Sequence, residues 1–479
     1  MLFNSLHFLV FFILVTSVYF CLKFKHRWVW LLTASCYFYM AFIPIYILIL
    51  AGTIVIDYFA GIFIESTSGK RRKALLLISL IANIGILVVF KYYNFFIDNI
   101  NPFLNQIGLE NKLPYINIIL PIGLSFHTFQ AMSYTIEVYR GNQKAEKHFG
   151  IYSLYVMFYP QLVAGPIERP QNLLHQFREE HKFDYFLVTS GLKLMAWGLF
   201  KKVVVADRLA IAVDTVYAAP ENYNSLSLII AIIFFTFQIY CDFSGYSDMA
   251  IGCAKVMGFK LMINFNRPYA SKNISEFWKR WHISLSTWFK DYLYISLGGN
   301  KVTLLRNCFN LLVVFILSGL WHGANWTFIV WGGLNGIFLI GGVIKNKVGF
   351  NWFSKFNLVN IFITFMLISF TWIFFRAPNL ECAIIVIKKM ACGIDDLFDS
   401  IRKNEVVVQN IGLNKKQLIF SISIIICLQL GQYLINQRRY FLNYLMSNKI
   451  IRWGLYYALV LSIVFFGVFE NRNFIYFQF

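Results

Sequence analysis

Long apolar stretches recur along the whole sequence and decide the class of fold. A helix that crosses the hydrocarbon core of a bilayer needs roughly 20 predominantly apolar residues. Hydrophobic residues make up 58% of the chain and charged residues only 14%, against about 25% charged in an ordinary soluble domain. We therefore predict an all-α, polytopic membrane protein. The twelve candidate spans are residues 3–22, 28–42, 45–64, 74–93, 149–163, 186–205, 226–243, 304–319, 327–344, 358–375, 418–434 and 453–469.

Two further stretches are apolar but irregular. Residues 115–138 and 274–297 are interrupted by proline, glycine and polar side chains. Irregular backbone at membrane depth is tolerated only where it is buried in protein or lines a water-filled cavity. We therefore predict that both stretches are re-entrant or interfacial segments.

The basic residues cluster beside the predicted spans and suggest an orientation. Clusters at 23–27 and 70–73 suit the cytoplasmic side, and the basic residues at 438–452 precede the last span. The positive-inside rule then places both termini outside. The net charge of +20 fits this rule and an affinity for anionic lipid, although some of these side chains could receive a phosphate-bearing substrate. There is no soluble basic domain, so nucleic acid is not an expected partner.

The cysteines and the loops add little chemistry. No two of the eight cysteines have metal-ligand spacing, so no metal site is expected. Cys382 and Cys392 could face the exterior, and a disulfide between them stays open. The mixed-charge segment 377–416 is predicted to be an exterior loop that either contacts a partner or simply connects two spans.

Polar and ionisable side chains crowd into apolar surroundings in the middle third of the chain. We treat the chain as one membrane-embedded domain with N-terminal helices (1–115), a core (116–345) and C-terminal helices (346–479). An ionisable residue inside a membrane is costly and is a functional candidate by default. The candidates are His127, Glu168, Arg169, Asp242, Asp248, Glu276, Lys279, Arg280, His282, Lys290, Asp291 and His322.

The segment around His282 has the pattern of an amphipathic helix. Glu276 and Arg280 are four residues apart and can pair along one face. His282 lies in an apolar stripe on such a helix, with Trp278, Trp281, Leu285 and Trp288. A segment of this kind lies at a membrane interface or dips into it.

His322 lies between Trp321 and Gly323 in the stretch SGLWHGANW. Glycine lets the backbone bend and lets other groups approach closely. Burial disfavours the imidazolium, and a neutral imidazole can take a proton from a hydroxyl as a general base. A purely structural role, in which the histidine bridges two helices by hydrogen bonds, is equally consistent with the residues alone.

The other ionisable groups point less clearly to chemistry. His127 is expected to be structural, and Asp242 and Asp248 are expected to pack or to form ion pairs with Arg267 or Arg169. A polar centre of this kind fits a proton-coupled transporter of a glycan or an acyl donor as well as an intramembrane enzyme. A scaffold that only anchors a secreted enzyme is a third class.

Five motifs together resemble a known family. They are PIGLSFHTFQ, LVAGPIERP, QIYCDFSGYSDMAIG, NFNRPYASKNISEFWKRWHISLS and SGLWHGANWTFIVWG. These motifs resemble those of the membrane-bound O-acyltransferases, and within them the branch of alginate and peptidoglycan O-acetyltransferase membrane subunits. WKRWHISLS and LWHGANW at this separation are the most specific of them.

The resemblance implies a fold and a site. The fold is a ring of about 11 or 12 transmembrane helices and re-entrant segments around a thin centre, in the bacterial cytoplasmic membrane. His322 matches the family's central histidine and His282 its second histidine. The resemblance implies acetyl-CoA as a donor substrate from the cytoplasm, with no tightly bound cofactor. Site-organising residues would be Trp321, Asn325, Trp281, Ser286, Glu168, Arg169, Asp242, Asp248 and His127.

The C-terminal sequence NRNFIYFQF supports a second resemblance. An aromatic tail can anchor a chain end at the membrane interface. FIYF also resembles the C-terminal motif of small proteins that act beside the D-alanyl-transferring relatives, and by that likeness Tyr476 would accept the acyl group. An exterior, membrane-tethered SGNH-like transferase or esterase would then pass it to a polysaccharide. The glycan is not identified, and a member of the family acting on lipid or protein is the nearest rival.

Overall fold

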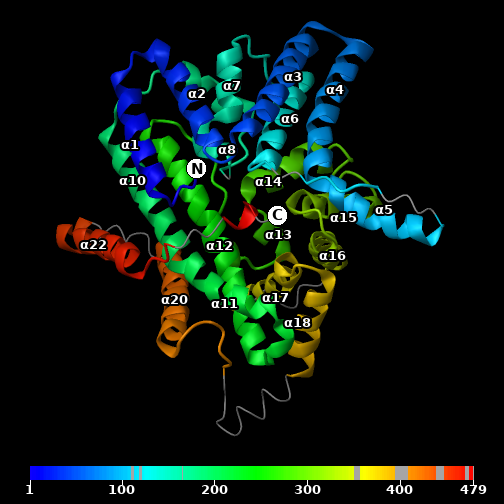
Figure 1. Ribbon diagram of the computed structural model, residues 1–479, viewed down its shortest axis with the longest axis vertical. Coiled ribbons are helices and arrows are strands. Elements are labelled where there is room, and N and C mark those ends of the chain that lie inside the picture. Colours follow the sequence, from blue (N-terminus) through cyan, green and yellow to red (C-terminus); the bar gives the residue numbers. More distant parts are fainter. Residues whose placement is uncertain are drawn as a thin grey trace. The chain divides into compact units, whose positions relative to one another are not determined.

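The computed structural model describes residues 1–108, 113–117, 121–163, 165–349, 357–393, 408–437, 447–469 and 474–477, and the regular structure in these ranges is helical (Figure 1). The chain divides into two compact units. Unit 1 comprises Met1–Met195 and Tyr246–Ile263, and unit 2 comprises Ala196–Gly245 and Asn264–Phe479. The boundaries fall within or beside the helices α10 (Tyr185–Leu199) and α12 (Ser225–Val256).

Unit 1 is built from the N-terminal helices. Helices α3, α4 and α6 pack against one another, and α2 packs against α7. The elements of the unit before α10 are α1 (Leu6–Cys21), α2 (Phe24–Met40), η1 (Pro44–Tyr46), α3 (Ile47–Ser66), α4 (Gly69–Leu87), η2 (Val88–Tyr92), α5 (Tyr93–Gln106), α6 (Leu124–Arg140), α7 (Phe149–Met157), α8 (Tyr159–Leu162), α9 (Pro170–Leu173) and η3 (His175–Arg178).

A buried polar network joins three helices of unit 1. The carboxylate of Asp57 on α3 accepts from Ser79 Oγ at 2.6 Å and from Asn83 Nδ2 at 2.9 and 3.0 Å, both on α4. Ser79 Oγ also lies 3.0 Å from Thr135 Oγ1 on α6. Because a polar group buried in apolar surroundings must be satisfied by hydrogen bonds, these contacts fix the register of the three helices.

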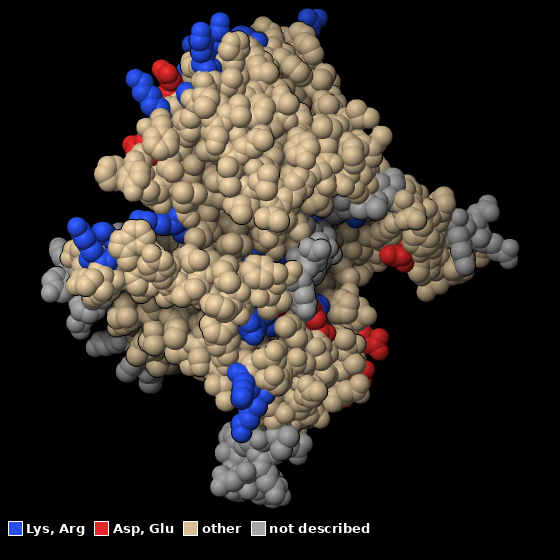
Figure 2. Space-filling model, turned by 60° about the vertical axis from the view of Figure 1, so that its left-hand side comes forward, with Lys and Arg blue, Asp and Glu red and all other residues tan. Residues whose placement is uncertain are grey.

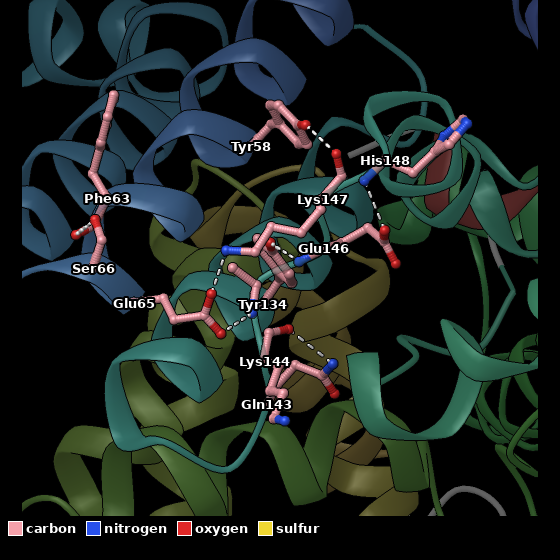
Figure 3. Close-up of polar contacts among 11 residues, drawn as sticks. Tyr58, Phe63, Glu65, Ser66, Tyr134, Gln143, Lys144, Glu146, Lys147 and His148 are labelled. Carbon is pink, nitrogen blue, oxygen red and sulfur yellow. Dashed lines mark hydrogen bonds and ion pairs between the residues drawn. The ribbon is translucent and has the colours of Figure 1, made fainter.

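The loop after α6 is fastened to its neighbours by both backbone and side chains (Figure 3). The Glu146 N–H donates to Tyr134 Oη at 2.9 Å, and Tyr58 Oη donates to the Lys147 carbonyl at 2.7 Å. Glu65 accepts from the Ala145 N–H at 3.0 Å and pairs with Lys147. The loop is therefore an ordered part of unit 1, held by hydrogen bonds and by the Lys147–Glu65 ion pair.

Unit 2 contains the remaining elements. Helices α15 and α16 form an antiparallel pair, and α16 also packs against α17. The elements are η4 (Phe200–Ala206), α11 (Asp207–Ala218), η5 (Pro220–Asn222), the first part of α12, η6 (Pro268–Ala270), α13 (Ile274–Trp278), α14 (Ile283–Trp288), η7 (Phe289–Tyr294), α15 (Leu304–His322), α16 (Trp326–Val348), α17 (Asn357–Arg376), α18 (Leu380–Cys392), α20 (Lys415–Gln437), α22 (Lys449–Phe466) and η8 (Ile475–Phe477).

Eight stretches among the described residues are long and apolar enough to cross a membrane. The protein is thus a multi-pass membrane protein. The spans are Pro44–Ser66, Gly69–Gln106, Ser225–Val256, Leu304–His322, Trp326–Val348, Asn357–Arg376, Lys415–Leu434 and Lys449–Phe466. Figure 2 shows that most of one face carries no Lys, Arg, Asp or Glu, as expected for a surface in contact with lipid.

The other four predicted spans form shorter helices. Helices α1, α2, α7 and α10 have 16, 17, 9 and 15 residues, and α7 ends where the backbone turns at Phe158. Of the two irregular stretches, 274–297 is broken into α13, α14 and η7, whereas 124–140 forms the continuous helix α6. That either stretch is re-entrant or interfacial stays a prediction.

The segment 377–416 is not a simple loop, because it contains α18. The segment's acidic residues Asp395, Asp396 and Asp399 lie outside the described residues, so the choice between a partner contact and a simple connector stays open. All eight cysteines are free, including Cys382 and Cys392.

Candidate active site

The turn between α15 and α16 positions His322. Helix α15 ends at His322, and the chain extends through Gly323 before α16 begins at Trp326. Asn325 caps α16, because its side chain accepts from the Thr327 N–H at 2.9 Å. Its amide also donates to the Pro378 carbonyl at 2.9 Å. Asn325 therefore organises the turn that presents His322.

Glycines let α15 and α16 approach closely around this turn. A Cβ on Gly319 would lie 2.2 Å from the Phe328 carbonyl oxygen, and one on Gly332 would lie 2.2 Å from the Phe315 carbonyl oxygen. A Cβ on Gly323 would lie 2.1 Å from the Phe328 ring. Small residues at a helix interface in a membrane allow such backbone contact. The position of His322 is therefore set by backbone packing.

His282 lies in a strained bend between α13 and α14. Its φ of 42° and ψ of 55° put it in the left-handed region, which costs roughly 1–3 kcal/mol for a residue other than glycine. Asn264 holds the bend, because its carbonyl accepts from the Ile283 N–H at 2.9 Å and its Oδ1 accepts from Ser284 Oγ at 2.7 Å. The surrounding hydrogen bonds thus maintain a conformation that the helix pattern did not predict.

The end of the chain brings Tyr476 to α12. The Ile475 N–H donates to Asp242 Oδ2 at 2.8 Å. The Tyr476 ring packs against Phe243 and Phe474, with ring centroids 4.4 and 5.4 Å apart. Phe474 and Ile475 are buried, and the Tyr476 hydroxyl is shielded from solvent. The C-terminal segment is therefore part of unit 2's interior and not a free tail.

Three of the candidate side chains converge in unit 2. The ring of Tyr476 lies 5.4 Å from that of His322 and 6.2 Å from that of His282, and the two histidine rings are 6.3 Å apart. His282 and His322 are 1% and 3% exposed. A phenol and two imidazoles thus meet in a site with little access for water.

Aromatic rings surround His322. Its ring centroid lies 4.9 Å from Trp321, 5.1 Å from Trp331 and 5.3 Å from Phe375. These contacts hold the imidazole in one orientation and exclude water from it. Trp321 also faces His282, at 5.9 Å between ring centroids.

Trp281 and Ser286 support the bend at His282 from either side. The Trp281 ring is 1% exposed and packs against Trp372 at 5.0 Å and Phe277 at 5.5 Å. Ser286 Oγ donates to the Trp281 carbonyl at 3.1 Å. Both residues lie in unit 2 and contribute to the frame of the site.

Burial sets the protonation of the two groups outside the spans. It lowers the pKa of His282 to about 3, so the imidazole is neutral at physiological pH. Burial, followed by the charge of Asp242, raises the pKa of the Tyr476 phenol well above its usual value. The phenol therefore keeps its proton until a nearby base removes it.

Asp242 pairs with a partner that the sequence did not predict. Its Oδ1 lies 2.8 Å from Lys202 Nζ, and Lys202 also pairs with Asp207 at 2.9 Å. The expected pairing with Arg267 or Arg169 is therefore wrong for Asp242. Lys202 lies in the predicted span 186–205. A lysine inside a membrane span is a functional candidate by default, and this signal could have pointed to the network from the sequence.

Four other candidates belong to unit 1. Glu168 is buried, accepts from the Met262 N–H, and has its pKa raised by burial to about 7. Arg169 Nη1 lies 3.4 Å from Ser133 Oγ, and His127 Nδ1 lies 3.2 Å from the Gly123 carbonyl oxygen. Asp248 is half-buried on α12. These residues are not among the side chains that meet in unit 2.

Other candidates from the amphipathic segment hold local structure. Glu276 and Arg280 pair at 2.5 Å, as their spacing predicted. Lys279 and Lys290 are exposed, and Asp291 is half-buried. Among the described residues, no group of three or more His, Cys, Asp or Glu side chains could hold a metal ion.

Comparison with known proteins identifies the family. The model of the MBOAT, or membrane-bound O-acyltransferase, family matches residues 146–377, which include both histidines. A protein of Pseudomonas aeruginosa named probable alginate O-acetylase is 40% identical over 390 residues, covering 80% of this chain and 73% of the relative. This chain belongs to the membrane-bound O-acyltransferase family.

Membership of the family makes the protein an acyltransferase and not a transporter. A peptidoglycan O-acetyltransferase of Helicobacter pylori is 38% identical over 389 residues, covering 75% of this chain and 73% of the relative. A teichoic acid D-alanyltransferase of Streptococcus thermophilus is 29% identical over 252 residues, covering 50% of this chain and 59% of the relative. All three names describe acyl transfer, with alginate, peptidoglycan or teichoic acid as the named polymer.

Proposed function

We propose that the protein is an O-acetyltransferase that moves acetyl from cytoplasmic acetyl-CoA to an extracytoplasmic polysaccharide through Tyr476. The observation that carries the proposal is the 5.4 Å separation of the His322 and Tyr476 rings in a buried site. The names of the alginate and peptidoglycan relatives support acetyl as the acyl group and a glycan as the final acceptor.

The first step is transfer to the phenol. Tyr476 Oη gives its proton to the neutral imidazole of His322 as it bonds to the acetyl carbonyl carbon. The carbon–sulfur bond breaks, and the CoA thiolate leaves and takes up the proton. A neutral phenol is a weak nucleophile, so an adjacent base is required. The close aromatic packing around His322 keeps that base oriented and dry.

His282 assists this step by orientation and by its neutral charge. Its ring centroid lies 6.2 Å from that of Tyr476 and 6.3 Å from that of His322. A second neutral imidazole can hydrogen-bond the phenol or the thioester oxygen without adding a charge to the buried site. The strained backbone at His282 is consistent with a position selected for function.

The second step hands acetyl to a partner. A tyrosyl ester is activated, because phenolate leaves more readily than an alkoxide. A serine of an exterior, membrane-tethered SGNH-like transferase would attack it, and the phenolate would regain a proton. The partner would then acetylate a hydroxyl of peptidoglycan, alginate or another envelope glycan. In this proposal the protein lies in the bacterial cytoplasmic membrane with both termini outside. Acetyl-CoA is a substrate that the reaction consumes and not a bound cofactor.

Polymer acetylation in cells tests the proposal. Cells carrying His322→Ala, Tyr476→Phe or the unaltered protein would be compared for ester-linked acetate on their envelope glycans, at matched protein levels in the membrane. Loss of acetate in both variants supports the relay. Acetate lost only with His322→Ala would keep the enzyme and discard Tyr476 as the carrier, and acetate retained with His322→Ala would refute the proposal.

A further inference from the structure

The end of the chain is fastened to the helical run that begins unit 2. The Val468 N–H donates to the Val203 carbonyl at 2.8 Å, and Arg208 Nη2 donates to the Phe466 carbonyl at 2.6 Å. Further along, the Ile475 N–H donates to Asp242. The first two contacts hold the chain where it leaves α22, whereas the third lies next to Tyr476.

Asp242 makes this third contact with a carboxylate that is already fixed. Its Oδ1 lies 2.8 Å from Lys202 Nζ, and its Oδ2 accepts from the Ile475 N–H at 2.8 Å. Asp242 is 3% exposed and Lys202 is 1% exposed. A charge-assisted hydrogen bond in such a dry setting is stronger than one between neutral groups.

Lys202 lies in an irregular helical turn. Lys202 and Val203 both lie on η4, a π-helical stretch between α10 and α11. Such π-bulges are rare and are frequent at functional sites. The Lys202 side chain pairs with Asp242. The Val203 carbonyl accepts from the Val468 N–H, at the start of the C-terminal segment.

We propose that Asp242 is a positioning residue that seats Tyr476 beside His322 by accepting the Ile475 N–H, while Lys202 holds the carboxylate in place. The proposal rests on the proposed function, in which Tyr476 carries the acetyl group. Consecutive Cα atoms are 3.8 Å apart, so fixing the Ile475 nitrogen confines the next residue to a small volume. Packing against Phe243, at 4.4 Å, then sets the ring.

A carboxylate can accept from the Lys202 ammonium and from the Ile475 N–H at once, because both of its oxygens are acceptors. An asparagine at this position has one acceptor oxygen and one donor nitrogen. If its oxygen faced Lys202, its NH₂ would meet the Ile475 N–H, which is also a donor. If its oxygen faced Ile475, its NH₂ would meet the ammonium. Because the ammonium carries a full charge, we expect the amide oxygen to face Lys202, so Asp242→Asn breaks the Ile475 contact without changing the size of the side chain.

A second substitution removes the contact from the other side. Ile475→Pro eliminates the N–H and leaves Lys202 and Asp242 untouched. Ile475 is the first residue of the short helix η8, a position at which proline fits well. Ile475→Val keeps the N–H and is the matched control. This pair distinguishes the seating of Tyr476 from any general effect of the buried ion pair on folding.

The test uses the full-length protein in detergent with acetyl-CoA and follows acetylation of Tyr476 by rapid-quench peptide mass spectrometry. We expect Ile475→Pro and Asp242→Asn to slow acetylation by about tenfold or more, as expected for loss of a hydrogen bond to a charged group. The KM for acetyl-CoA should be unchanged, and Ile475→Val should acetylate at the unaltered rate. Equal rates for Ile475→Pro and Ile475→Val would overturn the proposal.

Hydrogen exchange of the C-terminal peptide separates this proposal from the proposed function. In Asp242→Asn we expect the Ile475 amide to exchange at least tenfold faster than in the unaltered protein, whatever the chemistry of Tyr476. If the unaltered protein never carries acetyl on Tyr476, the proposed function fails, and the exchange result alone decides whether Asp242 holds the chain end. Unchanged exchange in Asp242→Asn would refute the positioning role.

Discussion

Two adjacent glycines on α16 provide a controlled test of how the site is built. A Cβ on Gly332 would lie 2.2 Å from the Phe315 carbonyl oxygen of α15, whereas a Cβ on Gly333 has nothing within 4 Å. Gly332 follows Trp331, whose ring contacts His322 at 5.1 Å. Gly332→Ala should therefore disturb His322, and Gly333→Ala should not.

The size of the effect follows from the geometry. Raising the Cβ distance from 2.2 Å to the 3.0 Å that real Cβ contacts respect requires a shift of about 0.8 Å between the two helices. The obstacle is backbone, so a rotamer change cannot relieve it. Overpacking of this kind costs about 1–3 kcal/mol, and a displacement of about 1 Å at a reacting group can lower a rate by about 100-fold.

The assay compares both variants in the same detergent. Thermal unfolding would report stability, and release of free CoA from acetyl-CoA would report transfer. We expect Gly332→Ala to unfold at a lower temperature and to lose most of its activity, and Gly333→Ala to match or slightly exceed the unaltered protein in stability. Equal behaviour of the two variants would refute the claim that backbone contact between α15 and α16 positions His322.

Further predictions concern charge, strain and chemistry. His322→Ala should lower the rate of acetyl transfer by about 100- to 10,000-fold, as expected for loss of a general base; a smaller loss would contradict the assigned role. The pKa of His282 is lowered to about 3 and is about 6.5 in an unfolded chain; the unfolded state therefore binds the extra proton, and stability should fall as pH drops from about 6.5 towards 3. Asparagine tolerates the left-handed conformation, so the denaturation midpoint of His282→Asn should no longer fall between about pH 6.5 and 3 on account of residue 282. A pH profile identical to that of the unaltered protein would contradict this prediction. Lys202→Met should cost roughly 3–5 kcal/mol in denaturant unfolding, because it leaves buried carboxylates without their cation.

The spans in unit 2 could be predicted closely because hydropathy alone defines them. The predicted stretches 304–319 and 327–344 became α15 (Leu304–His322) and α16 (Trp326–Val348). Both real helices run slightly further, because α15 continues to the histidine and Asn325 caps the start of α16. Hydropathy cannot locate the exact residue at which a helix ends, although the sequence HGAN is consistent with a turn between these two helices.

The bend at His282 could not be predicted from its own segment. The spacing of Glu276, Arg280 and the apolar stripe fits a continuous helix, and the pairing of Glu276 with Arg280 is confirmed. The helix breaks because Asn264, which is distant in sequence, binds the backbone and the side chain that follow His282. A local pattern carries no information about such a tertiary contact.

The grouping of the site residues was likewise beyond local pattern. Lys202 and Asp242 are forty positions apart and pair only because η4 lies beside α12. The closeness of Tyr476 to His322 came from a resemblance to relatives and not from any periodicity of the residues. Glu168 and Arg169 belong to unit 1 and Tyr476 belongs to unit 2, a division that the motifs alone did not indicate.

The central claim is that Tyr476 receives acetyl from acetyl-CoA with His322 as its base. The most direct measurement is intact-protein and peptide mass spectrometry of the purified protein after incubation with acetyl-CoA, beside His322→Ala and Tyr476→Phe. The account predicts one added acetyl group on the peptide containing Tyr476 in the unaltered protein and none in either variant. Acetyl on that peptide in His322→Ala at the unaltered level, or its absence from the unaltered protein, would contradict the account.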